Sequence, residues 1–375
     1  MSLSRRSTLK ALAAIGLSGA GTVAWMSSTS ADERTRILVS AAQHKRDGDG
    51  LGWWDSSTAT SRHVLSGFRG HSIIAHPLRA GHAVMMGRRP SMESVEVDLR
   101  NSKIVARVQS QAERHFFGHA VFSPDGAKLF TTENNLASGR GMVVVRDADN
   151  YQVLDEFESH GIGPHEIRMM PDGRTLIVAN GGILTRPESG REKLNLDSMD
   201  SSLVLIDTQD GSLTEQHRIP YPKASMRHLA VARDGRVAIG FQLQRAAMDN
   251  DSVAPLAGVL TPGRSIRVFH EPVNVLREMR DYVGSVAVNN DAGVAAFTSP
   301  RGNLAAFWNI DTGSFSGYHT LFDVSGVTVT DDQQFFVLSN SNGHIRYIDA
   351  NTLKEDKSRR LHAADVRWDN HLSYI

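Results

Sequence analysis

The chain has 375 residues, with 41 Lys and Arg against 41 Asp and Glu, and it contains no cysteine. The balanced charge argues against a dedicated nucleic-acid-binding protein, which normally carries a basic excess. The absence of cysteine excludes disulfides, thiolate zinc sites, iron–sulfur clusters and a cysteine nucleophile. Hydrophobic residues at 40% and charged residues at 22% are typical of globular proteins, and the length allows two average domains or one large all-β domain.

The first residues have the three parts of an export signal. A basic start at residues 4–10 (SRRSTLK) precedes an apolar run over 11–26 and small residues at 29–31. The paired arginines resemble the twin-arginine motif, in which Phe usually stands at the position of Thr8. A membrane anchor is the alternative, but the apolar run is shorter than the ~20 residues needed to span a bilayer. We therefore expect residues 1–31 to be a cleaved twin-arginine signal, leaving 32–375 as one periplasmic domain without membrane contact.

A repeat organises the chain after residue 32. A small or polar residue, an alternating apolar run and a tight turn recur clearly at residues 118–126, 164–173 and 227–235. Weaker copies lie at 70–77, 284–291 and 324–331. Most copies are followed by a second apolar run, a third run ending in Asp and a more polar fourth run. Short runs separated by Pro-Asp-Gly and Asp-Gly turns, without amphipathic helices, indicate an all-β fold. Four antiparallel strands in each repeated unit predict a β-propeller.

The two ends of the chain complete the count of blades. Residues 362–371 look like a seventh first strand with nothing after it. Residues 37–41, 52–55 and 63–68 look like second, third and fourth strands that lack a first. Joining them in one sheet predicts a seven-bladed propeller, closed between the C-terminal strand and three N-terminal strands, with no free edge.

The first strand of each propeller blade lines the central axis, so the residues that enter it are expected near one another. Five of these positions hold histidine, namely His71, His119, His165, His228 and His362. Ser285 and Ser325 hold the corresponding position in the other two blades. His119 and His228 stand six residues before the turn Asp, whereas His165 stands seven before its own. Because a one-residue slip reverses the direction of a side chain in a strand, the five imidazoles need not all converge.

The ends of the second strands are expected on the same face as these histidines. They supply the polar residues Gln43, His44, Arg88, Arg89, Glu133, Asn134, Asn180, Gln242, Arg301 and Asn340. Insertions at 183–200 and 245–263 should rise on this face as lids or partner-binding loops.

Three hypotheses for these residues stay open. The histidines could bind a transition metal such as iron, copper or zinc, or a metallo-cofactor, with Glu133 or Glu166 completing the site. Alternatively, the histidines with Arg88, Arg89 and Arg301 could form a polar funnel for an anionic ligand, with Asn134, Asn180 and Gln242 as further ligand-binding residues. In the third hypothesis each histidine only bonds the backbone of a neighbouring blade. We interpret the oxygen-rich residues 47–50 as a hairpin turn and not as a calcium loop, because no downstream Glu follows.

Several phrases resemble a family of unknown function. They are residues 115–119, 161–166, 170–173, 178–183 and 227–231, and the similarity covers essentially the whole chain after the signal. The resemblance implies a twin-arginine-exported, seven-bladed periplasmic propeller of the broader WD40 or YVTN type. Relatives tend to be encoded beside imelysin-like and di-haem peroxidase-like proteins, which implies an iron-related setting and a periplasmic partner protein from an iron-handling system. The family offers no catalytic residues to carry over. A more distant likeness to lactonase-type and surface-repeat propellers reflects the fold more than the chemistry.

The leading hypothesis from the sequence is therefore a non-enzymatic periplasmic propeller. It would bind a metal, a metallo-cofactor or an iron-handling partner protein on its histidine-bearing face. The alternative is a metal-assisted hydrolase or lactonase that uses the same mouth of the channel, with a metal-bound water as the nucleophile.

Overall fold

The Asp-Gly turns form the hairpins that the repeat predicts. In the clearest copies the glycine amide donates to the carbonyl of the residue three positions earlier, from Gly126 to Ser123 at 2.9 Å and from Gly173 to Met170 at 3.0 Å. Both glycines have positive φ, at 71° and 70°, a conformation that residues with a Cβ rarely adopt. These tight turns force consecutive runs to pair as antiparallel strands.

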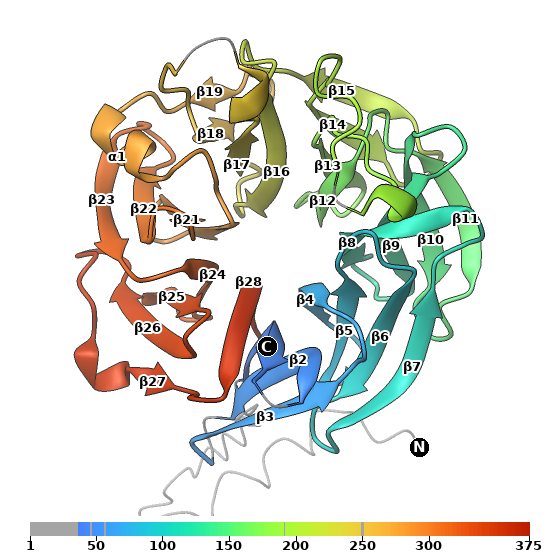
Figure 1. The fold of residues 1–375 in the computed structure, drawn as a ribbon, viewed down its shortest axis with the longest axis horizontal. Coiled ribbons are helices and arrows are strands. Elements are labelled where there is room, and N and C mark those ends of the chain that lie inside the picture. The colour runs from blue at the N-terminus through green and yellow to red at the C-terminus, as the bar shows by residue number, and fades with distance from the viewer. Residues whose placement is uncertain (1–36, 46, 56–57, 191, 249–250) are drawn as a thin grey trace, which may run out of the picture. The chain divides into compact units, whose positions relative to one another are not determined.

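A computed structural model describes residues 37–45, 47–55, 58–190, 192–248 and 251–375. These residues form seven four-stranded antiparallel sheets arranged as blades around an axis (Figure 1). The prediction of a seven-bladed β-propeller is confirmed. The predicted export signal at residues 1–31 lies outside the described residues. No helix in the described ranges combines the length and apolar character that crossing a membrane requires.

The blades are numbered here in chain order, and in each the strands are given from the axis outward. Blade 1 consists of β4 (Gly70–Ala75), β5 (His82–Gly87), β6 (Glu93–Asp98) and β7 (Lys103–Gln109). Blade 2 consists of β8 (Arg114–Phe122), β9 (Lys128–Asn135), β10 (Gly141–Asp147) and β11 (Val153–Glu158). Blade 3 consists of β12 (Pro164–Met169), β13 (Thr175–Asn180), β14 (Ser202–Asp207) and β15 (Leu213–His217).

Blade 4 consists of β16 (Ala224–Val231), β17 (Val237–Leu243), β18 (Ala257–Leu260) and β19 (Arg267–Val268). Blade 5 consists of β20 (Ser285–Asn289), β21 (Val294–Ser299), β22 (Leu304–Asn309) and β23 (Phe315–Thr320). Blade 6 consists of β24 (Val324–Val329), β25 (Phe335–Asn340), β26 (His344–Asp349) and β27 (Leu361–His362). Blade 7 consists of β28 (Val366–Tyr374), β1 (Ile37–His44), β2 (Gly48–Asp55) and β3 (Thr60–Leu65). The short helices are η1 (Pro187–Ser189), η2 (Arg245–Ala247), α1 (Val273–Glu278) and η3 (Lys357–Arg359).

Blade 7 closes the ring in the predicted way, but its innermost strand begins later than predicted. The C-terminal β28 pairs with β1, which is followed outward by β2 and β3. His362 does not enter β28; it ends β27 and pairs with His344 at the outer edge of blade 6. The placement of His362 on a first strand is therefore wrong. The two-residue β27 is followed after only three residues by the nine-residue β28, and their merged pattern gave no signal for the boundary.

The hydrophobic core lies between neighbouring blades. Trp53, Trp308 and Trp368 are at most 1% exposed and belong to three separate clusters of buried side chains. The ring of Trp308 stacks on Phe269 of the adjoining blade with centroids 5.6 Å apart. Each sheet therefore depends on its neighbours for the burial of its apolar faces, which makes closure of the ring important for stability.

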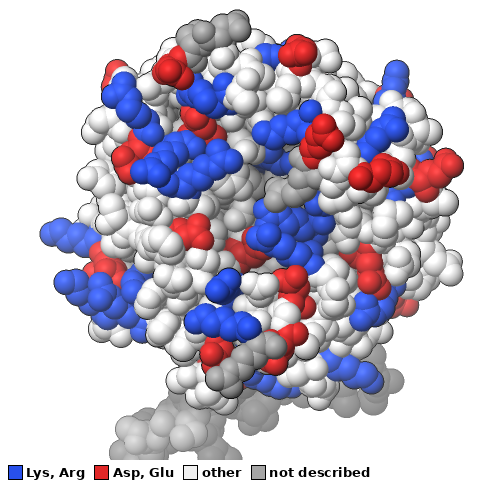
Figure 2. All heavy atoms as spheres, in the orientation of Figure 1, with Lys and Arg blue, Asp and Glu red and all other residues white. Residues whose placement is uncertain are grey.

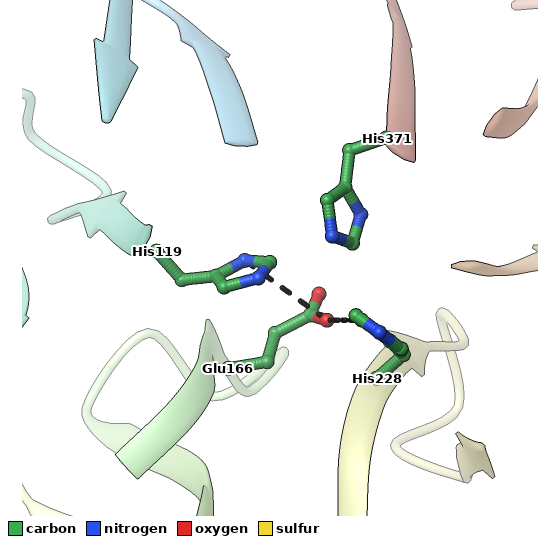
Figure 3. A group of neighbouring side chains, drawn as sticks. All are labelled: His119, Glu166, His228 and His371. Carbon is green, nitrogen blue, oxygen red and sulfur yellow. Dashed lines mark hydrogen bonds and ion pairs between the residues drawn. The ribbon is translucent and has the colours of Figure 1, made fainter. Parts of the chain in front are cut away.

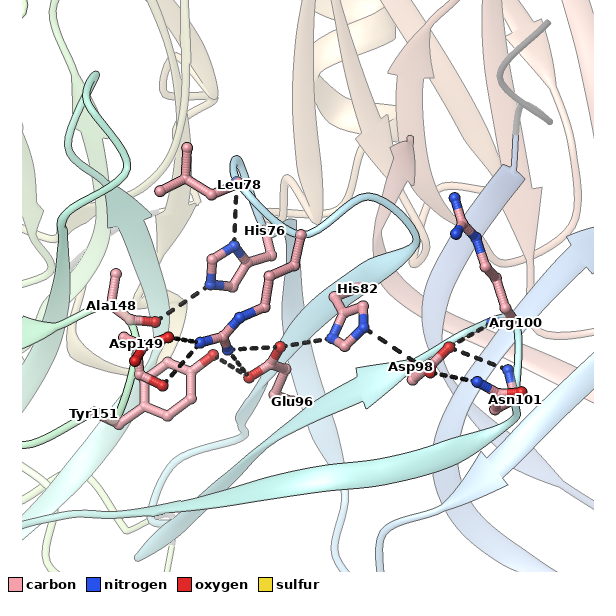
Figure 4. A network of polar contacts seen from close by, with 11 residues as sticks. His76, Leu78, His82, Glu96, Asp98, Arg100, Asn101, Ala148, Asp149 and Tyr151 are labelled. Carbon is pink, nitrogen blue, oxygen red and sulfur yellow. Dashed lines mark hydrogen bonds and ion pairs between the residues drawn. The ribbon is translucent and has the colours of Figure 1, made fainter. Parts of the chain in front are cut away.

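A polar network also joins blades 1 and 2 (Figure 4). The buried carboxylate of Glu96 in β6 accepts hydrogen bonds from the Tyr151 hydroxyl at 2.7 Å, His82 Nδ1 at 2.7 Å and Arg79 Nη1 at 2.8 Å. Tyr151 belongs to the β10–β11 turn of blade 2, so the bond crosses from one blade to the next. Burial and the nearby Glu96 carboxylate raise the pKa of Tyr151, which keeps its hydroxyl protonated and able to donate.

Replacing Tyr151 by Phe is expected to destabilise the protein by about 1–3 kcal/mol, because Glu96 would lose a donor in a buried site. Chemical denaturation followed by tryptophan fluorescence measures this change. Tyr318→Phe is the matched control, because Tyr318 is exposed in β23. An unfolding free energy for Tyr151→Phe equal to that of the control would show that the network contributes nothing.

Candidate metal centre

Five histidines project from the innermost strands of five different blades. They are His71 in β4, His119 in β8, His165 in β12, His228 in β16 and His371 in β28. Glu166 follows His165 in β12, and all six side chains are at most 6% exposed. These six residues are called the central histidine cluster below. The other two innermost strands carry Ser285 and Ser325 at the corresponding places, as predicted.

Breaks in strand pairing bring these histidines together. The register between first and second strands shifts between Gly70 and Ile73 in blade 1, between Phe116 and Ala120 in blade 2, and next to or around the histidine in blades 3, 4 and 7. A β-bulge bends a strand and redirects its side chains, and bulges are frequent beside functional sites. The one-residue differences in sequence spacing are thus absorbed locally, so that all the imidazoles converge.

Two backbone features in the cluster carry a conformational cost. Gly118 has φ of 108°, and a Cβ at this position would lie 2.5 Å from Cδ2 of His71, so only glycine lets that ring approach. His371 has φ of 66°, in the left-handed region that non-glycine residues rarely occupy. Such conformations are often found at functional sites, where the surrounding structure maintains them.

Several of the imidazole rings lie at the separations expected for neighbouring ligands of one metal ion. Nine pairs among the five imidazoles have ring centroids between 4.6 and 6.4 Å apart. A metal–nitrogen bond of about 2.1 Å places a ring centroid about 3.2 Å from the ion, so neighbouring ligands would have centroids about 4.5–5.2 Å apart. His371 meets this condition with His71, His119 and His228, at 4.7, 4.6 and 4.8 Å.

Two groups of potential ligands overlap within the cluster. One contains His119, Glu166, His228 and His371, and the other contains His71, His119 and His165; in each, the candidate ligand atoms lie within 4.8 Å of one another. Figure 3 shows the first group, with imidazoles from three strands directed toward the Glu166 carboxylate. His119 belongs to both groups. This buried His/Glu group could hold a metal ion.

Glu166 orients the histidine beside it. His228 Nδ1 lies 3.2 Å from Oε2 of Glu166, while Arg168 donates to Oε1 through Nε at 2.8 Å. A neutral imidazole that donates through Nδ1 to a carboxylate has its lone pair on Nε2. A carboxylate behind a histidine is a common arrangement for metal ligands, since it fixes the tautomer and strengthens the ligand.

The Nε2 atoms of the central histidine cluster have no hydrogen-bond partner in the described part of the chain. Nε2 of each of the five histidines is buried without one in the described part of the chain, and so is Nδ1 of His71. Buried polar atoms are nearly always paired, so six unpaired nitrogens in one place need an explanation. Coordination of a metal ion would use these lone pairs. The hypothesis that each histidine only bonds a neighbouring backbone does not account for them.

Burial and charge set the protonation of the cluster. Burial lowers the pKa of all five imidazoles, to about 3 for His119, so they are neutral at pH 7. Burial alone would raise the pKa of Glu166, but the charge of Arg168 and the contacts with His119 and His228 hold it well below its usual range. Neutral imidazoles beside an ionised carboxylate form a donor set that is ready for a cation.

The stability of the metal-free protein is expected to fall as the pH drops below about 6.5. In the unfolded chain the five histidines take up protons near their ordinary pKa of about 6.5, whereas in the folded protein their lowered pKa values keep them neutral. Protons therefore favour unfolding, by up to about 1.4 kcal/mol per pH unit for each histidine. Above about pH 7 these histidines no longer change the unfolding free energy with pH, because they are neutral in both the folded and the unfolded chain. Urea denaturation between pH 5 and 8 measures the unfolding free energy at each pH. In His119→Gln this free energy should fall less steeply below pH 6.5 than in the wild type. Equal pH dependence in the two proteins would contradict this explanation.

Glu133 does not belong to the central histidine cluster. Its carboxylate is fully buried. It forms an ion pair with Arg146 Nη2 at 2.7 Å and accepts a hydrogen bond from the Thr131 hydroxyl at 3.0 Å. None of the possible ligand groups among the described residues contains Glu133 or His362. Of the two glutamates considered from the sequence, Glu166 is the one beside the imidazoles.

The predicted ligand-binding residues have separate surroundings. Arg88 Nη1 pairs with Asp369 at 3.0 Å and so anchors the β28 segment that carries His371. The Arg301 guanidinium lies over the ring of Tyr282, 5.0 Å from its centroid. Arg88 and Arg301 therefore have different partners, although the charge of Arg88 still acts on His71, where burial is the main cause of the lowered pKa and Arg88 lowers it further.

The three amide side chains differ in their partners, and Gln242 is linked to the cluster through Arg227, whose Nη2 lies 3.5 Å from Nδ1 of His165. Asn180 is buried and bonds to Ser159 through both its amide oxygen and nitrogen. Gln242 accepts a hydrogen bond from Arg227. Asn134 is buried, and neither of its side-chain polar atoms has a hydrogen-bond partner in the described ranges.

A narrow hollow reaches one histidine of the cluster. Its lining consists of Arg89, Phe117, Gly163, His165, Gly181, Ile183, Ser225 and Arg227. No part of it is wide enough to hold a water molecule. The Arg89 guanidinium lies over the Phe117 ring, 5.3 Å from its centroid. On the face seen in Figure 2, Lys and Arg side chains gather near the middle, with acidic side chains beside them and mixed charges around the rim.

Comparison with known proteins identifies the family. The model of a family described as "Protein of unknown function (DUF1513)" matches residues 66–375. The chain belongs to the DUF1513 family. The resemblance inferred from the sequence phrases to a propeller family of unknown function is thereby confirmed. A search of curated proteins finds no match to the chain.

Solved structures support the fold of this DUF1513 member. It is similar to a chain of Kuenenia stuttgartiensis hydrazine synthase, with a TM-score of 0.61 and 12% sequence identity. The similarity covers 84% of this chain and 90% of that chain. At this identity the likeness shows the fold alone.

The sequence pointed to most of the cluster, and missed one ligand candidate. His371 lies in the C-terminal segment that the repeat had marked, but His362 was preferred because it stood nearer the expected start of the strand. Arg168, which holds Glu166 ionised, was not singled out; the alternation Glu166-Ile167-Arg168 places both charges on one side of β12 and could have revealed it.

Proposed function

We propose that this protein binds a transition-metal ion in the central histidine cluster and acts in the periplasm in iron handling. The observation that carries the metal proposal is the set of five buried Nε2 atoms without partners. A metal ion would take up their lone pairs, while Glu166 supplies a negative charge and fixes the tautomer of His228. Binding a metal to the folded chain alone would also stabilise the propeller.

The donor set favours ions that accept imidazole nitrogen. Iron, copper, zinc and nickel all bind imidazole, and the cluster contains no thiolate because the chain has no cysteine. Five imidazoles and one carboxylate are also too many donors for a simple four-coordinate structural zinc site. We place iron first because of the genetic setting that the sequence resemblance implies, with copper and zinc as the other ions to test. A periplasmic iron-handling protein is the proposed partner.

Binding is preferred over the alternative of a metal-assisted hydrolase or lactonase. A hydrolase needs space for a substrate beside the metal-bound water. The hollow at His165 is too narrow even for water, so Arg89 or Phe117 would have to move before a substrate could enter. A buried, nearly closed cage suits retention of an ion better than turnover.

Metal analysis of protein purified from the periplasmic fraction, in buffers without chelators, tests the proposal. We expect about one iron, copper or zinc ion per chain. Purified metal-free protein should recover the ion on incubation with the ferrous, cupric or zinc salt. Protein that is found outside the periplasm would contradict the localisation. Protein that carries no metal and binds none of these salts would contradict the metal function.

A further inference from the structure

A second group of metal-ligand side chains lies in blade 7. His44 ends β1, Asp47 stands in the turn after it, and His63 belongs to β3. One candidate ligand atom of each lies within 4.8 Å of the others. None of these residues belongs to the central histidine cluster.

The strand between the two histidines makes room for their rings. β2 separates β1 from β3, and it has glycine at Gly48, Gly50 and Gly52, every second position. A Cβ on Gly52 would lie 3.7 Å from Nε2 of His44, an ordinary van der Waals distance. The imidazoles of His44 and His63 stack across β2 with centroids 3.5 Å apart.

The polar atoms of this group are only partly used. Nε2 of His63 lies 3.5 Å from Oδ2 of Asp47, at the limit of a hydrogen bond. His44 is 6% exposed, and its Nε2 is buried without a hydrogen-bond partner in the described part of the chain. The side chains of His63 and Asp47 are 34% and 50% exposed. The group therefore combines a buried unpaired nitrogen on His44 with two side chains, His63 and Asp47, that solvent can reach.

We propose that His44, Asp47 and His63 form a second transition-metal site with open coordination positions toward solvent. Two imidazoles and one carboxylate are a common ligand set for zinc and ferrous iron. The stacked rings lie closer together than the separation of about 4.5–5.2 Å expected for two ligands of one ion, so the partly exposed His63 ring would turn away from His44 when the ion binds. The ion would also replace the long contact between His63 and Asp47. Since it would have three protein ligands and an exposed side, it would exchange with solvent more readily than an ion in the central histidine cluster. This site goes beyond the proposed function and does not depend on it.

The location gives the site a structural consequence. β1 pairs directly with the C-terminal β28, whereas β3 is the outermost strand of blade 7. An ion held by His44 and His63 would therefore link β3, the outermost strand, to β1, which pairs with β28 where the ring closes. Occupancy of this site should be visible as increased thermal stability.

Zinc binding by the purified protein tests the proposal. After removal of bound metal with a chelator, equilibrium dialysis against zinc chloride and metal analysis should give two zinc ions per chain. His63→Ala should lose one of the two ions and the part of the thermal stabilisation that zinc adds through it. His217→Ala is the matched control, because His217 also lies beside a carboxylate, Glu215 at 3.0 Å, but is in none of the ligand groups.

His119→Gln separates the two sites, because His119 belongs only to the central histidine cluster. If His63→Ala keeps both ions, or if only His119→Gln lowers the zinc content, the second site is overturned while the central one stands. If His63→Ala loses one ion and His119→Gln loses none, the second site is supported and the proposed central function fails. Because His63 is partly exposed, its variant should fold; circular dichroism checks this, and Asp47→Asn, which should weaken zinc binding at the same site, provides a second variant.

Discussion

Replacing His119 by Gln is expected to remove the metal ion from the central histidine cluster. His119 is the residue shared by the two overlapping groups of ligand candidates, and its Nε2 is buried without a partner. Mutation of a residue that only hydrogen-bonds to a metal ligand weakens metal affinity about 10–100-fold. Loss of a ligand itself should therefore weaken metal affinity by at least about 100-fold. Metal analysis and competition with a chromogenic chelator measure this change.

The same substitution should remove the stabilisation that the metal provides. A ligand present at about 100 times its Kd adds about 2.7 kcal/mol to the unfolding free energy of the state that binds it. Wild-type protein should therefore unfold at a higher temperature with metal than without, whereas His119→Gln should show little difference. His217→Gln, a histidine outside the cluster, serves as the control and should behave as wild type. Wild-type metal content in His119→Gln would contradict the proposed centre.

Replacing Glu133 by Ala is expected to destabilise the protein by about 3–5 kcal/mol without removing the central metal. Glu133 and Arg146 form an ion pair at 2.7 Å with side chains 0% and 3% exposed. Removing one member of a buried pair leaves the other charge uncompensated, and that is the main cost. Here Arg146, which also lies over the Phe116 ring, would be left without its carboxylate. Urea denaturation measures the loss.

The double substitution Glu133→Leu with Arg146→Met is the matched control. Exchange of both partners for apolar side chains of similar size is often neutral, so much of the stability should return. Metal analysis of folded Glu133→Ala distinguishes this structural role from the ligand role predicted from the sequence. Loss of the metal from a variant that is still folded would restore Glu133 as a ligand.

The sequence by itself determined the architecture of this protein. The three clear copies of the repeat have tight turns at Gly126, Gly173 and Gly235, and local turn chemistry fixes antiparallel pairing. The two chain ends held complementary parts of one blade, so closure followed from the count of strands. The strand position of His71, His119, His165 and His228 followed as well, because a repeated position in a repeated unit occupies an equivalent place around the axis.

The tertiary structure alone decided which of these side chains meet. Bulges near His119 and His165 redirect the imidazoles, and a bulge depends on packing between blades and not on local pattern. His371 and not His362 completes the cluster because the innermost strand of blade 7 begins only at Val366. Glu166 and not Glu133 accompanies the imidazoles because Glu133 is paired with Arg146. Contacts such as that of Arg146 with Glu133 form between strands of a folded sheet, where burial sets the free energy of each charge. The order of residues in the sequence predicts neither the burial of a charged side chain nor its partner.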